Sequence, residues 1–172
     1  MEIPSLNEAL LKMIEPKSLH CDKKSKEKFT GVVKTKYKLF AAKILPPLNF
    51  YLFFVLTSKI DACQRSFTIK IPFKDWEIIK SGYLAPVDSY LDYRKIEHLT
   101  EDDVLAKMND SGNKFVRIAK LPDEKFEEIK KEYQIRKAKG FYMKASPETK
   151  ELIDSALLGA NIESRVLEKL GL

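Results

Sequence analysis

Two hydroxyls and a cation follow one another at Thr57, Ser58 and Lys59, directly after a strongly apolar stretch. That stretch, residues 48–56, is rich in aromatic and β-branched residues, contains a single Asn and is preceded by two prolines. The pattern predicts a strand buried on both faces rather than a helix. Such a strand carries its last side chains to a rigid, solvent-accessible sheet edge, so we expect a functional site there. The alternative is that these three residues only end the strand.

The positive charge of the chain is concentrated in one segment. The formal net charge is +6, and Lys17–Lys43 alone contains nine lysines against Asp22 and Glu27. A local cationic field of this kind suits a phosphate backbone or another polyanion. A solvated lysine-rich loop that only aids solubility is the equally weighted alternative.

Composition narrows the class of protein. The chain has 172 residues, of which 44% are hydrophobic and 33% are charged, as expected for one globular domain with terminal additions. Cys21 and Cys63 are too few for a disulfide framework, so we expect a reducing cytoplasm. These cysteines and His20 and His98 show no metal-ligand spacing, and no nucleotide-binding glycine motif occurs. We therefore expect no metal and no cofactor.

The sequence also argues against a membrane protein. Acidic residues stand near the start, where a signal peptide would need basic ones. The apolar stretch from Leu39 to Thr57 is interrupted by Lys43, two prolines and an Asn, and its uninterrupted part is shorter than the ~20 residues of a membrane span.

Several short strands and five helices are expected along the chain. The basic segment Lys17–Lys28 is predicted as a loop. Strands are expected at 29–33, 39–45, the central stretch, 65–71, 83–90 and 114–119, whereas 92–99 is ambiguous. Helices are expected at 4–14 (capped by Ser5), after the capping box 100–103, and at 122–139, 146–158 and 162–170.

Short strands joined by tight turns predict an α+β protein built on a small, strongly curved antiparallel β-barrel of SH3-like type, with accessory N- and C-terminal helices. We divide the chain into an N-terminal helix and basic loop (1–28), a barrel domain (29–139) and a C-terminal helical extension (140–172).

Several segments together resemble one known family. Leu39–Pro47 and Leu52–Lys59 look like the second and third strands of MazF/PemK-type toxins. Gly82–Leu99 is similar to the family's strand followed by a D-x-I-x-x-L segment, and Lys120–Ile129 resembles its K-L-S-D-E helix start. No single motif is specific, but their order and spacing match over roughly residues 29–133.

The resemblance implies a curved barrel that forms a homodimer, cleaves RNA without a metal and is paired with an antitoxin protein. The family's strand-end Thr or Ser corresponds to Thr57 and Ser58. Its basic residue, usually an Arg before a Pro, has no counterpart here, where Lys34, Lys36 and Lys38 occupy that region. Lysine supplies a point charge to a phosphate but not the bidentate fork of an arginine.

Cleavage of RNA requires a base for the 2′-hydroxyl, an acid for the leaving oxygen and positive charge near the phosphorane. We assign Thr57 and Ser58 to the phosphate, Lys36 or Lys38 to the phosphorane, and Asp92 to the base or to the orientation of a partner group. Alternatively, Lys36 is a solvated lysine and Asp92 caps the turn at Tyr93. Contacts to RNA are expected from the following side chains: Lys34, Lys38, Lys59, Tyr37 and Arg94.

Some aromatic residues are candidates for base stacking, namely Tyr37, Tyr51, Tyr90 and Tyr93, although Tyr51 fits core packing better and His98 is expected to be structural. Two further hypotheses stay open. The same barrel with segment 17–43 forms a catalytically silent module that binds nucleic acid or protein, or the chain is a subunit of a larger assembly.

Overall fold

In the computed structural model, the apolar stretch forms an interior strand of the sheet, β3 (Phe50–Thr57), as predicted. The structure describes residues 5–12, 14–23, 35–44, 49–109, 114–139 and 145–171. Six of the eight β3 residues are buried, because strands β2 and β6 flank it and helices cover the sheet. The prediction of a strand buried on both faces is confirmed.

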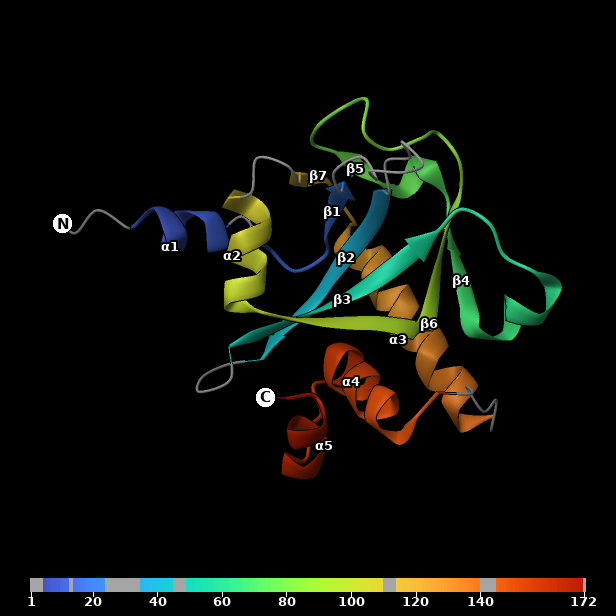
Figure 1. Ribbon diagram of the computed structural model, residues 1–172. Coiled ribbons are helices and arrows are strands. Elements are labelled where there is room, and N and C mark those ends of the chain that lie inside the picture. Colours follow the sequence, from blue (N-terminus) through green and yellow to red (C-terminus); the bar gives the residue numbers. More distant parts are fainter. Residues whose placement is uncertain are drawn as a thin grey trace, which may run out of the picture.

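Seven strands form one antiparallel sheet in the order β4-β6-β3-β2-β1-β7-β5. Irregularities in register between Leu19 and His20, between Phe40 and Ala42, and between Phe54 and Leu56 increase its curvature. The sheet curls into half a barrel (Figure 1), which confirms the predicted α+β fold with a small curved antiparallel sheet. The strands are β1 (Ser18–Lys23), β2 (Thr35–Ile44), β3, β4 (Thr68–Ile71), β5 (Glu77–Ile78), β6 (Ser89–Thr100) and β7 (Lys114–Lys120).

Strand β1 corrects the loop prediction for Lys17–Lys28. Residues 18–23 pair with β2 on one side and β7 on the other, so the sheet begins well before residue 29. Leu19 and Cys21 enter the main core, while Ser18, His20 and Asp22 are buried on the opposite face. The sequence alone does not reveal this alternation, because the polar residues are buried only where partners from distant parts of the chain bind them.

The bounds of several other elements also differ from those predicted. The prediction of a strand over 65–71 was too long, because residues 62–67 form the 3₁₀ helix η1 (Ala62–Phe67) before β4. The prediction of a strand at 83–90 was wrong for most of its length, since residues 79–88 form bends and turns. Strand β6 begins only at Ser89 and runs through the segment 92–99, whose conformation was ambiguous. A second 3₁₀ helix, η2 (Phe73–Asp75), precedes Trp76.

The helices lie where the sequence predicts them. Ser5 and Glu8 form a capping box on the first helix, and Thr100 and Asp103 exchange a second pair of capping hydrogen bonds of 3.1 Å each. A left-handed Gly159 ends the fourth helix. The helices are α1 (Leu6–Leu11), α2 (Glu101–Asn109), α3 (Asp123–Ala138), α4 (Pro147–Leu158) and α5 (Ser164–Lys169).

The sheet separates two apolar clusters. The larger cluster joins one sheet face to α3 and α4, with contributions from Tyr93, Tyr133 and Ile153. The smaller one lies on the opposite face beneath α1 and α2, and includes Phe40 and Phe53. Figure 1 shows α1 and α2 at the end of the sheet away from β4, with α4 and α5 below it.

Some predictions lie outside the described residues: the strand at 29–33, Lys34, the turn at Pro46–Pro47, the turn at 110–113 and the helix stop at Gly140. Within the described ranges, none of the helices is long and apolar enough to cross a membrane.

Candidate functional site

Charged side chains from β2 and β6 meet across β3. Lys38 Nζ lies 2.8 Å from Glu97 Oε2, and Lys36 Nζ lies 3.8 Å from Glu97 Oε1. Lys36 is 46% exposed and Glu97 is 34% exposed, whereas Lys38 is only 4% exposed. Glu97 therefore has one oxygen held in the interior and one turned toward a more accessible lysine.

Lys36 and Thr57 lie at the end of the pairing between β2 and β3. Tyr37 pairs with Leu56, and Lys36 and Thr57 are the next residues along the two antiparallel strands. Adjacent residues of a strand point to opposite faces, so Lys36 and Thr57 lie on the face opposite to Tyr37 and Leu56. This is the face on which Lys36 reaches Glu97. The register thus puts Lys36 and Thr57, two residues predicted for catalysis, on the same face, one position beyond the Tyr37–Leu56 pair.

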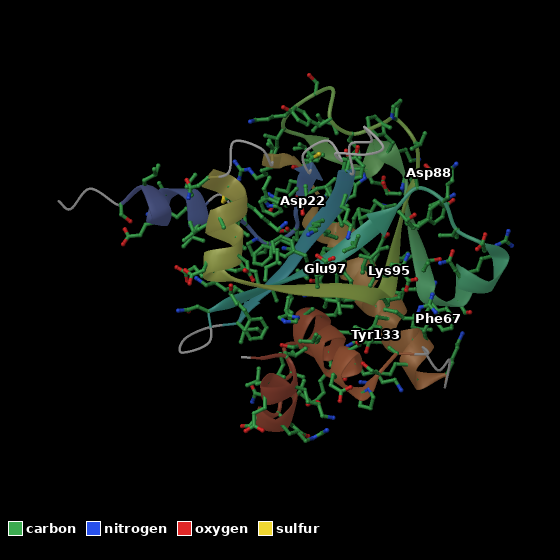
Figure 2. All side chains as sticks on the ribbon, in the orientation of Figure 1. Asp22, Phe67, Asp88, Lys95, Glu97 and Tyr133 are labelled. Carbon is green, nitrogen blue, oxygen red and sulfur yellow. The ribbon has the colours of Figure 1, made fainter. Side chains whose placement is uncertain are left out.

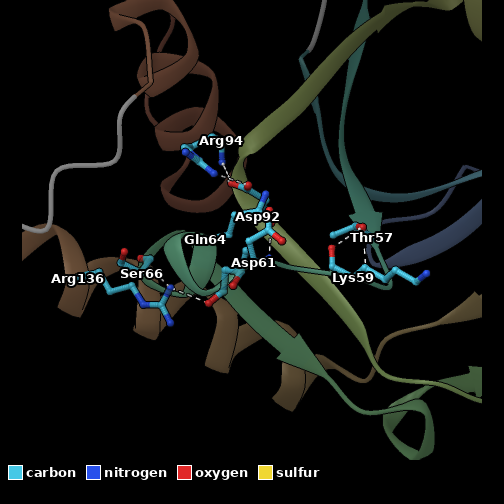
Figure 3. A network of polar contacts seen from close by, with 9 residues as sticks. Thr57, Lys59, Asp61, Gln64, Ser66, Asp92, Arg94 and Arg136 are labelled. Atoms are coloured by element: carbon cyan, nitrogen blue, oxygen red, sulfur yellow. Dashed lines mark hydrogen bonds and ion pairs between the residues drawn. The ribbon is translucent and has the colours of Figure 1, made fainter.

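Thr57 ends β3 in a local turn that leaves its neighbours exposed. Its Oγ1 donates to the Lys59 carbonyl at 3.1 Å and accepts from the Lys59 amide at 3.3 Å. The Ser58 and Lys59 side chains are exposed. Figure 3 shows Thr57 and Lys59 joined in this way at the end of the strand. Ser58 and Lys59 therefore face solvent at the end of β3, whereas Glu97 lies opposite Phe53, four residues further back along the strand.

The interior side of this site is a buried network of charges. Asp22 Oδ2 lies 2.8 Å from Lys38 Nζ and 3.0 Å from the Nζ of Lys107, which belongs to α2. Burial alone would raise the pKa of Asp22, but the hydrogen bonds and charges of the two lysines hold it below its ordinary value. For Glu97, burial likewise acts to raise the pKa, and Lys38 and Lys36 lower it overall. Both carboxylates are consequently ionised at neutral pH.

Lys38 was predicted to contact RNA, and the structure gives it an interior position. Burial acts to lower its pKa, yet its hydrogen bonds and charges with Asp22 and Glu97 raise it above the ordinary lysine value. The side chain is thus a permanent cation that fixes two carboxylates. Its 4% exposure leaves little of it accessible to a ligand.

Asp92 belongs to a different group of contacts. Its carboxylate is 1% exposed and accepts from Arg94 Nε at 3.0 Å, from Arg94 Nη2 at 2.8 Å and from the Arg94 amide at 2.9 Å. The Arg94 guanidinium stacks on Phe67, 3.9 Å from the ring centroid. Figure 3 shows Asp92 turned toward Arg94, as a separate set of contacts from Thr57 and Lys59. Asp92 and Arg94, a predicted base and a predicted RNA contact, thus bind each other.

Most of the tyrosines that were candidates for base stacking pack or hydrogen-bond within the fold. Tyr51 and Tyr93 are 1% and 0% exposed, and the Tyr93 hydroxyl donates to the Ile129 carbonyl at 2.9 Å. Tyr37 donates to the Tyr83 carbonyl at 2.8 Å. Tyr90 is half-buried opposite Thr57. Of the four tyrosines, Tyr90 is therefore the one placed beside the proposed site.

Glu97 is the site residue that sequence reasoning missed. Figure 2 shows it on β6. The available signal was the alternation of Lys95 and Glu97 with Ile96 and His98, which is typical of a strand with one polar face. The pairing that brings this face to Lys36 and Lys38 is long-range and was not readable from the pattern.

The described residues form no cluster of metal ligands. Among the residues that the structure describes, no three His, Cys, Asp or Glu side chains are grouped so that they could hold a metal ion. Sequence comparisons add no family assignment, since neither a family model nor a curated protein matches the chain.

Proposed function

We propose that the chain is a toxin-like endoribonuclease that cleaves single-stranded RNA without a metal, at a site formed by Thr57, Ser58, Lys36 and Glu97. The observation that supports the proposal is that Lys36 and Thr57 share one face at the end of the β2–β3 pairing, with Lys36 Nζ 3.8 Å from Glu97 Oε1. Thr57, Lys36 and Glu97 then lie on one face of the sheet and supply a hydroxyl, an ammonium group and an ionised carboxylate. These are the groups that a side-chain mechanism of phosphodiester cleavage requires.

In the proposed reaction, Glu97 accepts the proton of the ribose 2′-hydroxyl, and the 2′-oxygen attacks the phosphorus. Thr57, Ser58 and Lys59 donate to the phosphorane oxygens and stabilise their charge. Lys36 protonates the 5′-oxygen as the P–O5′ bond breaks. The products are a 2′,3′-cyclic phosphate and a 5′-hydroxyl end. Glu97 replaces Asp92 as the base in this scheme, because Asp92 is 1% exposed and bound by Arg94, whereas Glu97 is 34% exposed.

The test is cleavage of labelled single-stranded RNAs by the purified protein in the presence of a chelator. Thr57→Val, Lys36→Met and Glu97→Gln should each lower the rate by about 100-fold or more, as expected for loss of a general acid, a general base or a charge-stabilising donor. The matched controls are Lys74→Met and Glu124→Gln, which change exposed residues outside the site. Intact RNA across a range of sequences, or cleavage that survives all three site variants, would contradict the proposal.

A second candidate function is a binding module that holds nucleic acid without cleaving it, through the same barrel and segment 17–43. One observation favours it. Lys38, which was predicted to contact RNA, is bound by Asp22 and Glu97, and Asp92, the predicted base, is bound by Arg94. Steeply salt-dependent RNA binding without turnover would select this function. Lys36→Met and Lys59→Met should then each reduce the slope of the log binding constant against log salt concentration by about 0.7, because each removes one phosphate contact.

The proposal includes the partners that the family resemblance implies: RNA, an antitoxin protein and a second copy of the chain in a homodimer, all in the cytoplasm. Light scattering of the purified protein tests the dimer. Growth arrest on expression, relieved by a co-expressed neighbouring gene product, tests the toxin–antitoxin pair.

A further inference from the structure

Strand β4 is an edge of the sheet. Its one strand neighbour among the described residues is β6, with Ile69 opposite Leu91 and Lys70 opposite Tyr90. In an antiparallel pair, each residue directs both its N–H and its C=O to the same side, and successive residues alternate. One half of the β4 backbone groups therefore faces away from β6.

Arg136 of α3 occupies part of this edge. Its Nη1 donates to the Thr68 carbonyl at 2.8 Å and to the Ser66 carbonyl at 3.1 Å, while its Nε donates to Glu132 Oε1 at 3.0 Å. Figure 3 shows the guanidinium reaching from the helix to the segment that leads into β4. The Thr68 carbonyl thus faces away from β6. By alternation, the N–H and C=O of Lys70 do so too.

A groove runs along this edge between β4 and α3. One part, with a cavity volume of about 230 Å³, is lined by Lys70 and Ile71 on the strand and Ile129 on the helix. A second part, of about 450 Å³, shares Ile69 and Glu128 with the first and includes Ile135. Ile135 is 46% exposed, so the groove offers apolar surface next to unpaired backbone groups.

The charge along the groove is positive. Its lining residues, together with those of the smaller hollow at Arg65 and Lys139, include six basic and three acidic side chains. The acidic ones already have partners on the protein, because Lys125 pairs with Asp75 and Glu128, and Arg136 pairs with Glu132. Lys70, Lys131, Arg65 and Lys139 have no acidic partner within 4.0 Å among the described residues.

We propose that the β4 edge and the adjoining face of α3 form a docking site for an extended acidic peptide segment of a partner protein, which adds to the sheet as a further strand. Backbone hydrogen bonds to Lys70 give the affinity, and apolar side chains of the peptide enter beside Ile69 and Ile135. Its acidic side chains meet the lysines without acidic partners and Arg136. This site adjoins the proposed RNA site, because Lys70 and Thr57 both pair with Tyr90, but it uses other residues and its argument does not depend on RNA cleavage.

The test uses a fluorescent peptide of about eight residues in which Val and Glu alternate, long enough to cover a typical strand. Fluorescence anisotropy with the full chain should show saturable binding, and a Val-Lys peptide of equal length should not bind. Amide shifts in NMR spectra should locate the change at residues 68–71 and 128–136. An N-methylated peptide that lacks alternate backbone donors should bind about tenfold more weakly, because it loses edge hydrogen bonds.

A pair of variants distinguishes the contribution of the Lys70 backbone N–H to peptide binding from that of the Lys70 side-chain charge. Lys70→Pro removes the outward N–H and leaves the β6 ladder intact, as proline is tolerated at an edge. It should weaken binding by about tenfold relative to Lys70→Ala, which removes the charge alone. Thermal unfolding of both variants verifies that they are folded, and the N-methylated peptide supplies the same test on the unchanged protein.

Three results would overturn the proposal. The first is no saturable binding of the Val-Glu peptide at millimolar concentration. The second is equal binding of the N-methylated and unmodified peptides. The third is self-association of the free chain that Lys70→Pro abolishes, since this assigns the edge to a second copy.

Discussion

Lys38 Nζ lies 2.8 Å from Glu97 Oε2, although the two residues belong to strands that are separated by β3 in the sheet. The same ammonium lies 2.8 Å from Asp22 on β1. One buried cation therefore links strands on both sides of the sheet centre. Glu97 is also within reach of Lys36, so the network that stabilises the sheet also positions the proposed base.

Lys38→Met should lower the free energy of unfolding by about 3–5 kcal/mol, because it leaves two carboxylates without their buried partner. Lys36→Met, at a half-exposed position in the same strand, should change it by about 0–1 kcal/mol. Urea unfolding followed by circular dichroism measures both. Adding Asp22→Asn and Glu97→Gln to Lys38→Met should restore part of the loss, since the two carboxylate charges that lost Lys38 are removed. A Lys38→Met protein as stable as Lys36→Met would contradict the assigned role.

His20 should make the protein lose stability as the pH falls below neutrality. It is completely buried, its Nε2 lies 2.8 Å from Ser18 Oγ, and its Nδ1 has no hydrogen-bond partner within the described structure. Burial and the charge of Arg117 lower its pKa to about 3, from 6.5. Between these two values the unfolded chain binds a proton that the folded chain does not, so stability is complete above pH 6.5 and falls with decreasing pH.

The slope expected from His20 is about 1.4 kcal/mol per pH unit over that range. Unfolding free energies measured between pH 7 and about pH 4 should show a smaller slope in His20→Gln, where the titrating ring is absent. His98→Gln, at a half-buried position on β6, serves as the matched control for the loss of an imidazole ring. Equal slopes in all three proteins would show that His20 is not buried in its neutral form. Asp22 and Glu97 add a further loss only below their ordinary pKa values of 3.8 and 4.5, because their folded pKa values are lower still.

Asp92→Asn should cost stability without changing RNA chemistry. The substitution removes the charge that accepts two hydrogen bonds from the Arg94 side chain, worth about 2–3 kcal/mol in total. The cleavage rate per folded molecule should match the parent, whereas Thr57→Val should show the reverse pattern of normal stability and lost cleavage. Asp88→Asn, at an exposed position, controls for the change in net charge. A selective loss of the cleavage rate in a stable Asp92→Asn protein would return Asp92 to the role of base.

The parts of the fold that were readable from the sequence depend on local patterns. The apolar run of β3, the charged ends of α3 and the capping box at Thr100 each carry their signal within a few residues. Strand β1 was missed because Ser18, His20 and Asp22 look like loop residues until Lys38 and Lys107 are placed beside them. The same reason explains why the candidate site was predicted only in part. Thr57 and Lys36 were readable as separate motifs, whereas Glu97 is recognised only once strand pairing places it near Lys36 and Lys38.

Arg136→Leu should convert the β4 edge into a site of self-association. The guanidinium now donates to the Thr68 and Ser66 carbonyls, and an uncovered edge with added apolar surface is a template for pairing with another chain. Light scattering over rising protein concentration should show larger species for Arg136→Leu than for Gln134→Leu, which adds the same side chain at an exposed position of the same helix. Adding Lys70→Pro to Arg136→Leu should suppress these species, because proline removes the outward N–H on which strand pairing depends. If both leucine variants scatter alike, Arg136 does not protect the edge, and exposed leucine alone accounts for the association.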